Sequence, residues 1–167
     1  MIDNLVCFAH GKESGPWGTK ITHLAQIARA RGFGVLSPDY RHTHDPRERV
    51  AHLVKLAPQA HRLVLAGSSM GAYVSAMACT SLKPRALFLM APALYFPGWD
   101  EEPGGVPTLT TVVHGWRDDV VPVDRAWRFA QTNRSELHVV ESGHTLNDQL
   151  PVLGSLFGAL LERAVQL

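Results

Sequence analysis

Short apolar runs alternate with amphipathic segments along the whole chain. The apolar runs are bounded by polar residues, glycine or proline, which predicts buried strands. Between them, apolar side chains recur at the spacing i, i+3, i+4, i+7, which predicts amphipathic helices. Alternating strands and helices are typical of a parallel sheet covered on both faces by right-handed crossovers. The six expected strands cover residues 5–9, 33–37, 62–66, 85–90, 109–113 and 137–141.

One of these strands passes directly into a helix through a pattern suited to a nucleophile. The run of residues 63–72 ends in Gly67-Ser68-Ser69-Met70-Gly71, a Gly-x-Ser-x-Gly pattern, followed by small residues. A serine on a sharp corner needs neighbours without a Cβ, so that strand and helix can approach closely and leave its Oγ exposed. The segment therefore predicts a nucleophile elbow with Ser69 on the turn.

Polar side chains that suit an acid and a base follow two later strands. The strand over 109–113 runs into His114-Gly115-Trp116-Arg117-Asp118-Asp119, and the strand over 137–141 runs into Ser142-Gly143-His144. In an open parallel sheet, ligands bind beyond the carboxyl ends of the strands. The order serine, aspartate, histidine at three strand ends is the order of a hydrolase catalytic triad. Spacing within the chain leaves Asp118, Asp119 and Glu141 open as the acid.

These motifs resemble the α/β-hydrolase superfamily over nearly the whole chain. The matching residues are His10-Gly11, the block 67–71, His114-Gly115 with Asp118 and Val121-Pro122, and Gly143-His144. The resemblance implies an α/β-hydrolase fold, a three-layer sandwich with strand order 2-1-3-4-5-6. It selects Asp118 as the acid over Asp119 and Glu141. Unlike larger members, the chain lacks room for antiparallel N-terminal strands or an inserted cap domain.

The same residues predict acyl-transfer chemistry. His144 would take the proton of Ser69 as the serine attacks a carbonyl carbon, and Asp118 would orient the imidazole. The amide of Met70 would donate to the developing oxyanion, and similarity to families with the His-Gly start makes Lys12 the second donor. We expect His10 and His114 to hydrogen-bond to nearby backbone instead.

A long irregular segment at residues 91–107 follows the fourth predicted strand. Loops of this length usually form binding surfaces. Its aromatic side chains Tyr95, Phe96 and Trp99 are candidates for the substrate pocket, with Trp17 a weaker one.

Composition fits one globular domain over residues 1–167. The chain has 46% hydrophobic residues and 16 Lys and Arg against 15 Asp and Glu, which does not favour nucleic acid. The first apolar run is too short for a signal peptide or membrane span, so we expect a cytoplasmic protein. Cys7 and Cys79 fit small buried side chains better than a disulfide.

We therefore predict a cofactor-free serine hydrolase for a carboxylic ester or thioester of a small molecule. The polar loop at His42-Thr43-His44-Asp45 has no further ligands at metal-binding spacing, and we expect no metal. A haloalkane dehalogenase would have Asp at position 69, and a dienelactone hydrolase would have Cys. An amidase or small peptidase stays open because the same triad cleaves amides, and so does a non-catalytic ligand-binding protein on this fold.

Overall fold

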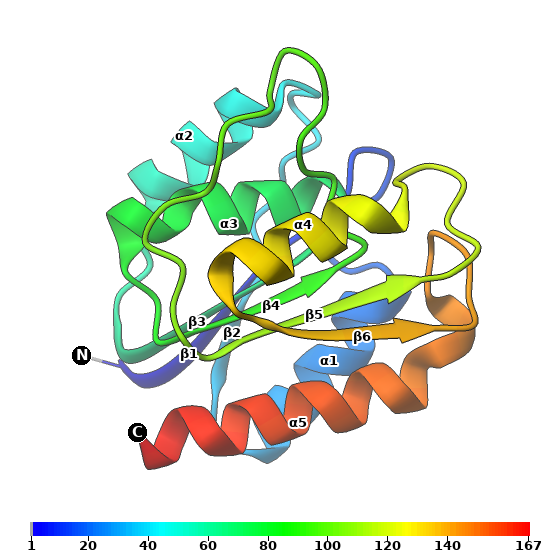
Figure 1. Cartoon of the computed structure of the whole chain (residues 1–167). Helices are drawn as coiled ribbons and strands as arrows, with labels where there is room; N and C mark the ends of the chain where they lie inside the picture. The colour runs from blue at the N-terminus through cyan, green and yellow to red at the C-terminus, as the bar shows by residue number, and fades with distance from the viewer. Residues whose placement is uncertain (1) are drawn as a thin grey trace.

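The computed structural model describes residues 2–167, and six parallel strands form one sheet in the order β2-β1-β3-β4-β5-β6 (Figure 1). Every neighbouring pair is parallel, so the predicted architecture and strand order are confirmed. The observed strands differ from the predicted ones only in their first and last residues. For example, the second strand is shorter than residues 33–37, and the third begins before Arg62. The strands are β1 Ile2–Ala9, β2 Gly34–Leu36, β3 Ala60–Ser68, β4 Ala86–Met90, β5 Thr110–Gly115 and β6 Glu136–Val140.

Helices cover both faces of the sheet. Figure 1 shows α1 and α5 on one face and α2, α3 and α4 on the other. Helix α2 begins at Pro46, because the Asp45 side chain accepts from the Arg47 amide at 2.8 Å and proline suits the first turn. The elements are α1 Thr19–Ala30, α2 Pro46–Leu56, α3 Met70–Leu82, α4 Val123–Asn133, the 3₁₀ turn Asn147–Gln149, and α5 Leu150–Gln166. None of the helices within residues 2–167 is long and apolar enough to cross a lipid bilayer.

Each face of the sheet has its own hydrophobic core. On the α1 and α5 face, Phe157 packs against Phe88 and Phe8, with ring centroids 5.1 and 6.0 Å away. On the other face, small residues of α3 let this helix lie directly on the sheet. Cys7 and Cys79 are buried free thiols, as expected, and burial raises the pKa of each to about 12.

The connection between β4 and β5 runs back along α3 before it enters β5 (Figure 1). The backbone there lies so close to the helix that a Cβ on Gly105 would be 2.9 Å from Thr80 Cα. The loops that follow the other strands meet at the carboxyl edge of the sheet. This edge is where the candidate chemistry lies.

Candidate active site

Ser69 occupies the turn between β3 and α3 in a backbone conformation that side-chain-bearing residues rarely adopt. Its φ is 55° and its ψ is −118°. The Ser69 amide donates to the Met90 carbonyl at 2.9 Å, and its carbonyl accepts from the Ala93 amide at 3.1 Å. The end of β4 and the loop after it therefore hold the strained turn in place through both the N–H and the C=O of Ser69.

Two glycines make this turn possible. A Cβ on Gly67 would lie 2.2 Å from the Gly71 carbonyl oxygen, and a Cβ on Gly71 would lie 1.9 Å from the Ala9 carbonyl oxygen. Strand β3, helix α3 and the end of β1 thus touch through backbone atoms alone. The elbow predicted from the sequence is present, with the reason predicted for its glycines.

Replacing Gly71 by alanine is expected to destabilise the protein by about 3 kcal/mol or to prevent folding. The new methyl group meets the Ala9 backbone, which cannot yield as a flexible side chain would. Urea unfolding measures the loss. Gly15→Ala is the matched control, because its Cβ would have no neighbour closer than 3.8 Å. Equal stability of the two variants would contradict the close contact.

Three side chains from distant loops form one hydrogen-bonded chain. His144 Nε2 lies 3.0 Å from Ser69 Oγ, and His144 Nδ1 lies 2.8 Å from Asp118 Oδ2. The Asp118 side chain has no exposed surface, whereas about a fifth of the His144 side chain is exposed. The hydroxyl, imidazole and carboxylate are thus in the order required to pass a proton.

The loop after β5 holds the Asp118 carboxylate by its other oxygen. Asp118 Oδ1 accepts from the Val120 amide at 2.9 Å and from the Val121 amide at 2.8 Å. Asp119 is exposed, and Glu141 forms an ion pair with Arg117. Of the three carboxylates that the sequence leaves open, Asp118 alone contacts His144 in the part of the chain that the structure describes.

Backbone contacts between the β5 and β6 loops bring Asp118 to His144. The Trp116 amide donates to the Val140 carbonyl, and the Arg117 amide donates to the Ser142 carbonyl, both at 2.9 Å. A Cβ on Gly115 would lie 2.3 Å from the Ser142 carbonyl oxygen. Glycine at the end of β5 therefore lets the two loops lie side by side.

His10 and His114 bond to backbone, as predicted. The Tyr40 amide donates to His10 Nε2 at 2.9 Å, so His10 Nδ1 holds the proton and donates to the Gly11 carbonyl at 2.8 Å. His114 Nε2 donates to the Val121 carbonyl at 2.8 Å and lies 3.3 Å from Asp118 Oδ2. Burial lowers the pKa of both histidines, which keeps them neutral.

A pocket of about 500 Å³ opens over Ser69 Oγ. Lys12 and Met70 line it, and neither of their amides donates to another group within residues 2–167. Met70 is the first residue of α3, where the helix dipole also favours negative charge. Of the four aromatic candidates, Phe96 and Trp99 line this pocket.

The other two aromatic candidates lie outside the pocket lining. Trp17 is half exposed, and the guanidinium of Arg29 lies 5.7 Å from its ring centroid. Tyr95 is buried at a φ of 61°, its hydroxyl donating to Glu102 at 2.8 Å. A role for these two residues in substrate binding stays a prediction.

Comparison with known proteins agrees with this geometry. The sequence profile of the alpha/beta hydrolase family matches residues 8–164. The chain belongs to the alpha/beta hydrolase family. A search among curated proteins gives no match to this alpha/beta hydrolase.

Several solved structures resemble this alpha/beta hydrolase. A protein of Xanthomonas campestris pv. campestris assigned to the alpha/beta hydrolase superfamily is 31% identical, with a TM-score of 0.87 over 98% of this chain and 99% of its own. Est1E from Butyrivibrio proteoclasticus is 15% identical, with a TM-score of 0.84 over 99% and 90%. A serine hydrolase without lid from Xanthomonas campestris is 22% identical, with a TM-score of 0.71 over 98% and 83%. The last two show the fold alone.

Sequence reasoning missed several residues of the site in this alpha/beta hydrolase. Lys20 lines the pocket, and its Nζ donates to the Thr145 carbonyl at 2.5 Å; burial lowers its pKa. Arg49 lies behind the Gly11-Lys12 turn without exposed surface. Arg49 is four residues before the buried Leu53, so a charged residue on an apolar helix face was the available indication.

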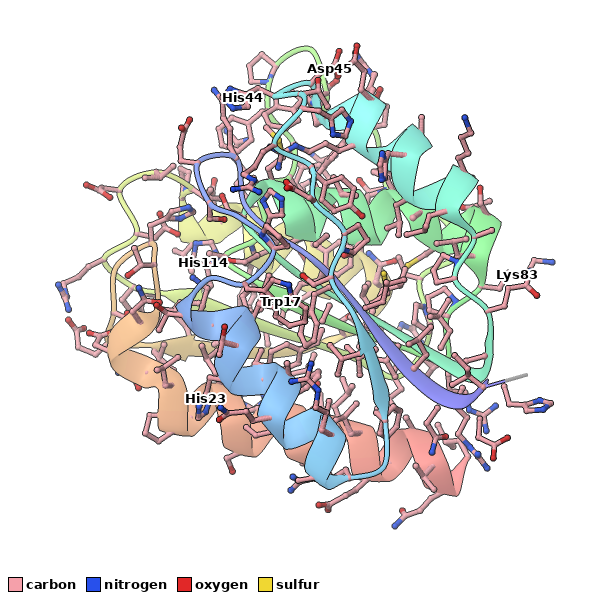
Figure 2. All side chains as sticks on the ribbon, turned by 180° about the vertical axis from the view of Figure 1, so that it is seen from behind. Trp17, His23, His44, Asp45, Lys83 and His114 are labelled. Carbon is pink, nitrogen blue, oxygen red and sulfur yellow. The ribbon has the colours of Figure 1, made fainter. Side chains whose placement is uncertain are left out.

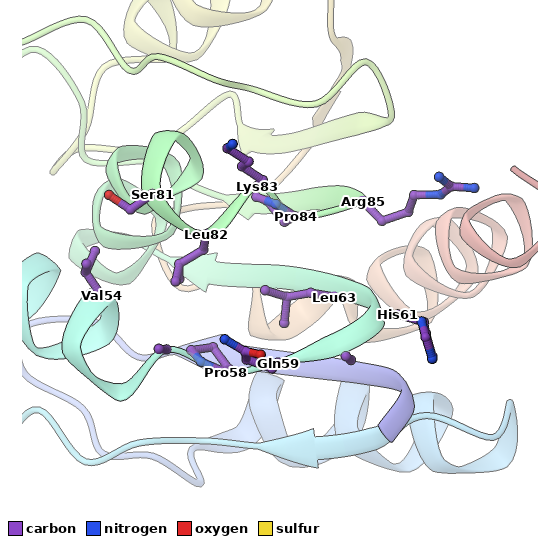
Figure 3. Close-up of a pocket in the computed structure, with 12 residues that line it drawn as sticks. Val54, Pro58, Gln59, His61, Leu63, Ser81, Leu82, Lys83, Pro84 and Arg85 are labelled. Atoms are coloured by element: carbon purple, nitrogen blue, oxygen red, sulfur yellow. The ribbon is translucent and has the colours of Figure 1, made fainter. Parts of the chain in front are cut away.

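A larger hollow of about 660 Å³ lies at the opposite end of β3 (Figure 3). The ends of α2 and α3 and the beginnings of β3 and β4 surround it, with Leu63 on its floor and Lys83 and His61 at its sides. Its lining contains no paired nucleophile and base. Ser69 and His144, which are hydrogen-bonded to each other, line the smaller pocket instead.

The loop before α2 has a structural role at its end. Figure 2 shows His44 and Asp45 at the outer tip of the molecule, away from His114. Asp45 caps α2. Within residues 2–167, no three His, Cys, Asp or Glu side chains gather closely enough to hold a metal ion.

Proposed function

We propose that this alpha/beta hydrolase is a serine hydrolase that cleaves a carboxylic ester or thioester of a small molecule through an acyl-enzyme. The observation that supports it most directly is the unbroken chain from Ser69 Oγ through His144 to Asp118, at 3.0 and 2.8 Å. A serine hydroxyl is a weak nucleophile at neutral pH and needs such a base.

In the proposed reaction, His144 Nε2 accepts the Ser69 proton while Oγ attacks the substrate carbonyl carbon. His144 Nδ1 donates its proton to the Asp118 carboxylate, which keeps that proton on Nδ1, leaves a lone pair on Nε2 and stabilises the imidazolium that forms. His144 then protonates the leaving alcohol or thiol. A water molecule, deprotonated by the same histidine, hydrolyses the acyl-enzyme.

The negative charge of the tetrahedral intermediate would be held by two backbone amides. The Met70 and Lys12 amides line the pocket beside Ser69 and have no acceptor within residues 2–167. Fixed donors stabilise the developing oxyanion without reorganising during the reaction. The pocket wall is apolar at Phe96, Trp99 and Val120, which offers a contact surface for an apolar acyl group.

Labelling with a fluorophosphonate tests the proposal. The wild type is expected to gain one phosphonyl adduct, located by mass spectrometry on the peptide that contains Ser69, and Ser69→Ala is expected to gain none. Ser75→Ala is the control, because Ser75 is a buried serine of α3 whose hydroxyl has no hydrogen-bond partner within residues 2–167. The control should be labelled like the wild type.

The outcomes separate the alternatives. Labelling that persists in Ser69→Ala would place the nucleophile elsewhere. A folded wild type that stays unlabelled would favour a ligand-binding role. If Ser69 is labelled, rates on matched ester, thioester and amide substrates with the same acyl group decide between an esterase and an amidase.

A further inference from the structure

Arg49 is a buried charge whose partners are all uncharged. It lies on the inner face of α2 and has no exposed surface, and no carboxylate within residues 2–167 is close enough to form an ion pair with it. A guanidinium stays protonated even here. Burying a charge without a counterion is costly, and an apolar residue would fill the site at lower cost.

The donors of Arg49 converge on the turn that follows β1. Nη1 donates to the Gly11 carbonyl at 3.0 Å and to the His10 carbonyl at 3.3 Å, while Nη2 donates to the Lys12 carbonyl at 3.4 Å. Nε donates to the Thr43 carbonyl at 2.9 Å, and the guanidinium lies 5.9 Å from the ring centroid of Tyr40. One side chain thus binds three consecutive carbonyls of one turn.

The peptide unit between Gly11 and Lys12 connects these contacts to Ser69. Its C=O and its N–H point in opposite directions, because the peptide is planar and trans. Arg49 and His10 Nδ1 both bind the C=O end. The other side of Gly11 faces the nucleophile, since a Cβ built there would be 3.6 Å from Ser69 Cβ. The Lys12 N–H is therefore directed away from Arg49, and Lys12 lines the pocket that contains Ser69.

We propose that Arg49 is a positioning residue that orients and polarises the Lys12 amide as an oxyanion donor. A cation at the carbonyl end of a peptide withdraws electron density from its N–H and strengthens the bond that this N–H donates. The inference rests on the proposed serine hydrolase function. It explains why a charge, instead of an apolar side chain, occupies this position.

The test compares Arg49→Met with Leu53→Ala. Leu53 is equally buried on the same face of α2, so its truncation destabilises the helix without touching the turn. We measure kcat and KM on an ester, with kcat calculated per active site titrated by the fluorophosphonate. We also measure the Ki of a trifluoromethyl ketone, which forms a tetrahedral oxyanion adduct with serine. A merely structural role would leave these quantities unchanged in the folded fraction.

Arg49→Met is expected to lower kcat and weaken the ketone by about 10 to 10² each, part of the 10²–10³ typical of a lost oxyanion donor. KM should change far less, because the ground-state carbonyl depends little on this donor. Arg49→Lys keeps the positive charge but loses the planar guanidinium with its several donors. Its kcat and Ki should therefore lie between those of the wild type and of Arg49→Met. Leu53→Ala should lower Tm and leave kcat and Ki at the wild-type values.

The inference would be overturned if Arg49→Met had the same kcat and Ki as the wild type. It would also be overturned if Arg49→Met and Leu53→Ala lost kcat and ketone affinity to the same extent. If no Arg49 variant folds, the wild type still decides: the Lys12 amide resonance should move downfield when the ketone adduct forms, and an unmoved resonance would also overturn it. A wild type that is neither labelled at Ser69 nor active on esters would instead contradict the proposed function.

Discussion

Replacing His144 by alanine is expected to lower kcat for ester hydrolysis by about 10⁶, and adding Ser69→Ala to that variant is expected to lower it no further. The two groups act as a unit, because the Ser69 hydroxyl is useful only when His144 Nε2, 3.0 Å away, accepts its proton. Each single variant therefore already loses the whole contribution. Residual activity would come from the oxyanion donors and from binding.

Steady-state kinetics on one activated ester would give kcat for the wild type, for the two single variants and for the double variant. His61→Ala is the control: His61 is an exposed histidine at the start of β3, and its loss should change kcat by less than about twofold. Losses that multiply in the double variant would mean that Ser69 and His144 act independently. A Ser69→Ala rate near that of the wild type would exclude Ser69 as the nucleophile.

The second largest effect is expected for Asp118→Asn, a loss of about 10⁴ in kcat. The amide side chain of this variant would keep its carbonyl oxygen on the Val120 and Val121 amides, which donate to Oδ1 at 2.9 and 2.8 Å. Its NH₂ group would then face His144 Nδ1 and donate to it. This reverses the tautomer, so that Nε2 bears the proton and can no longer accept one from Ser69.

Asp119→Asn is the matched control for this prediction. It makes the same change of one carboxylate to an amide in the next, exposed residue. Its kcat is expected to stay within about twofold of the wild type. Urea unfolding should show that both variants are folded. A larger loss in Asp119→Asn than in Asp118→Asn would assign the acid to the neighbouring residue.

The sequence by itself determined the architecture and the positions of the reacting groups. Buried parallel strands need continuous apolar runs, and amphipathic helices need apolar positions at helical spacing. Both can therefore be recognised from a short stretch of sequence. The elbow is also local, because Gly67 and Gly71 have to lack a Cβ for β3 and α3 to touch. The ends of β3, β5 and β6 then had to meet at one edge of the sheet.

Spacing along the chain left the acid open and the resemblance to the family selected Asp118, but only the tertiary structure shows which side chains meet there. Asp118 and Asp119 are adjacent and chemically alike, and the fold of the turn, closed by the Val120 and Val121 amides, directs only the first toward His144. Tyr95 and Phe96 also differ: Tyr95 is buried with its hydroxyl on Glu102, whereas Phe96 lines the pocket, and no pattern of hydrophobicity reveals this difference.

Arg49 shows the same limit over a longer range. Its contacts with Gly11 and Lys12 join residues 38 and 37 positions apart. A local pattern records whether a side chain is buried, because burial depends on its own chemistry and spacing. It does not record which backbone group the side chain meets, since packing of whole elements decides that direction.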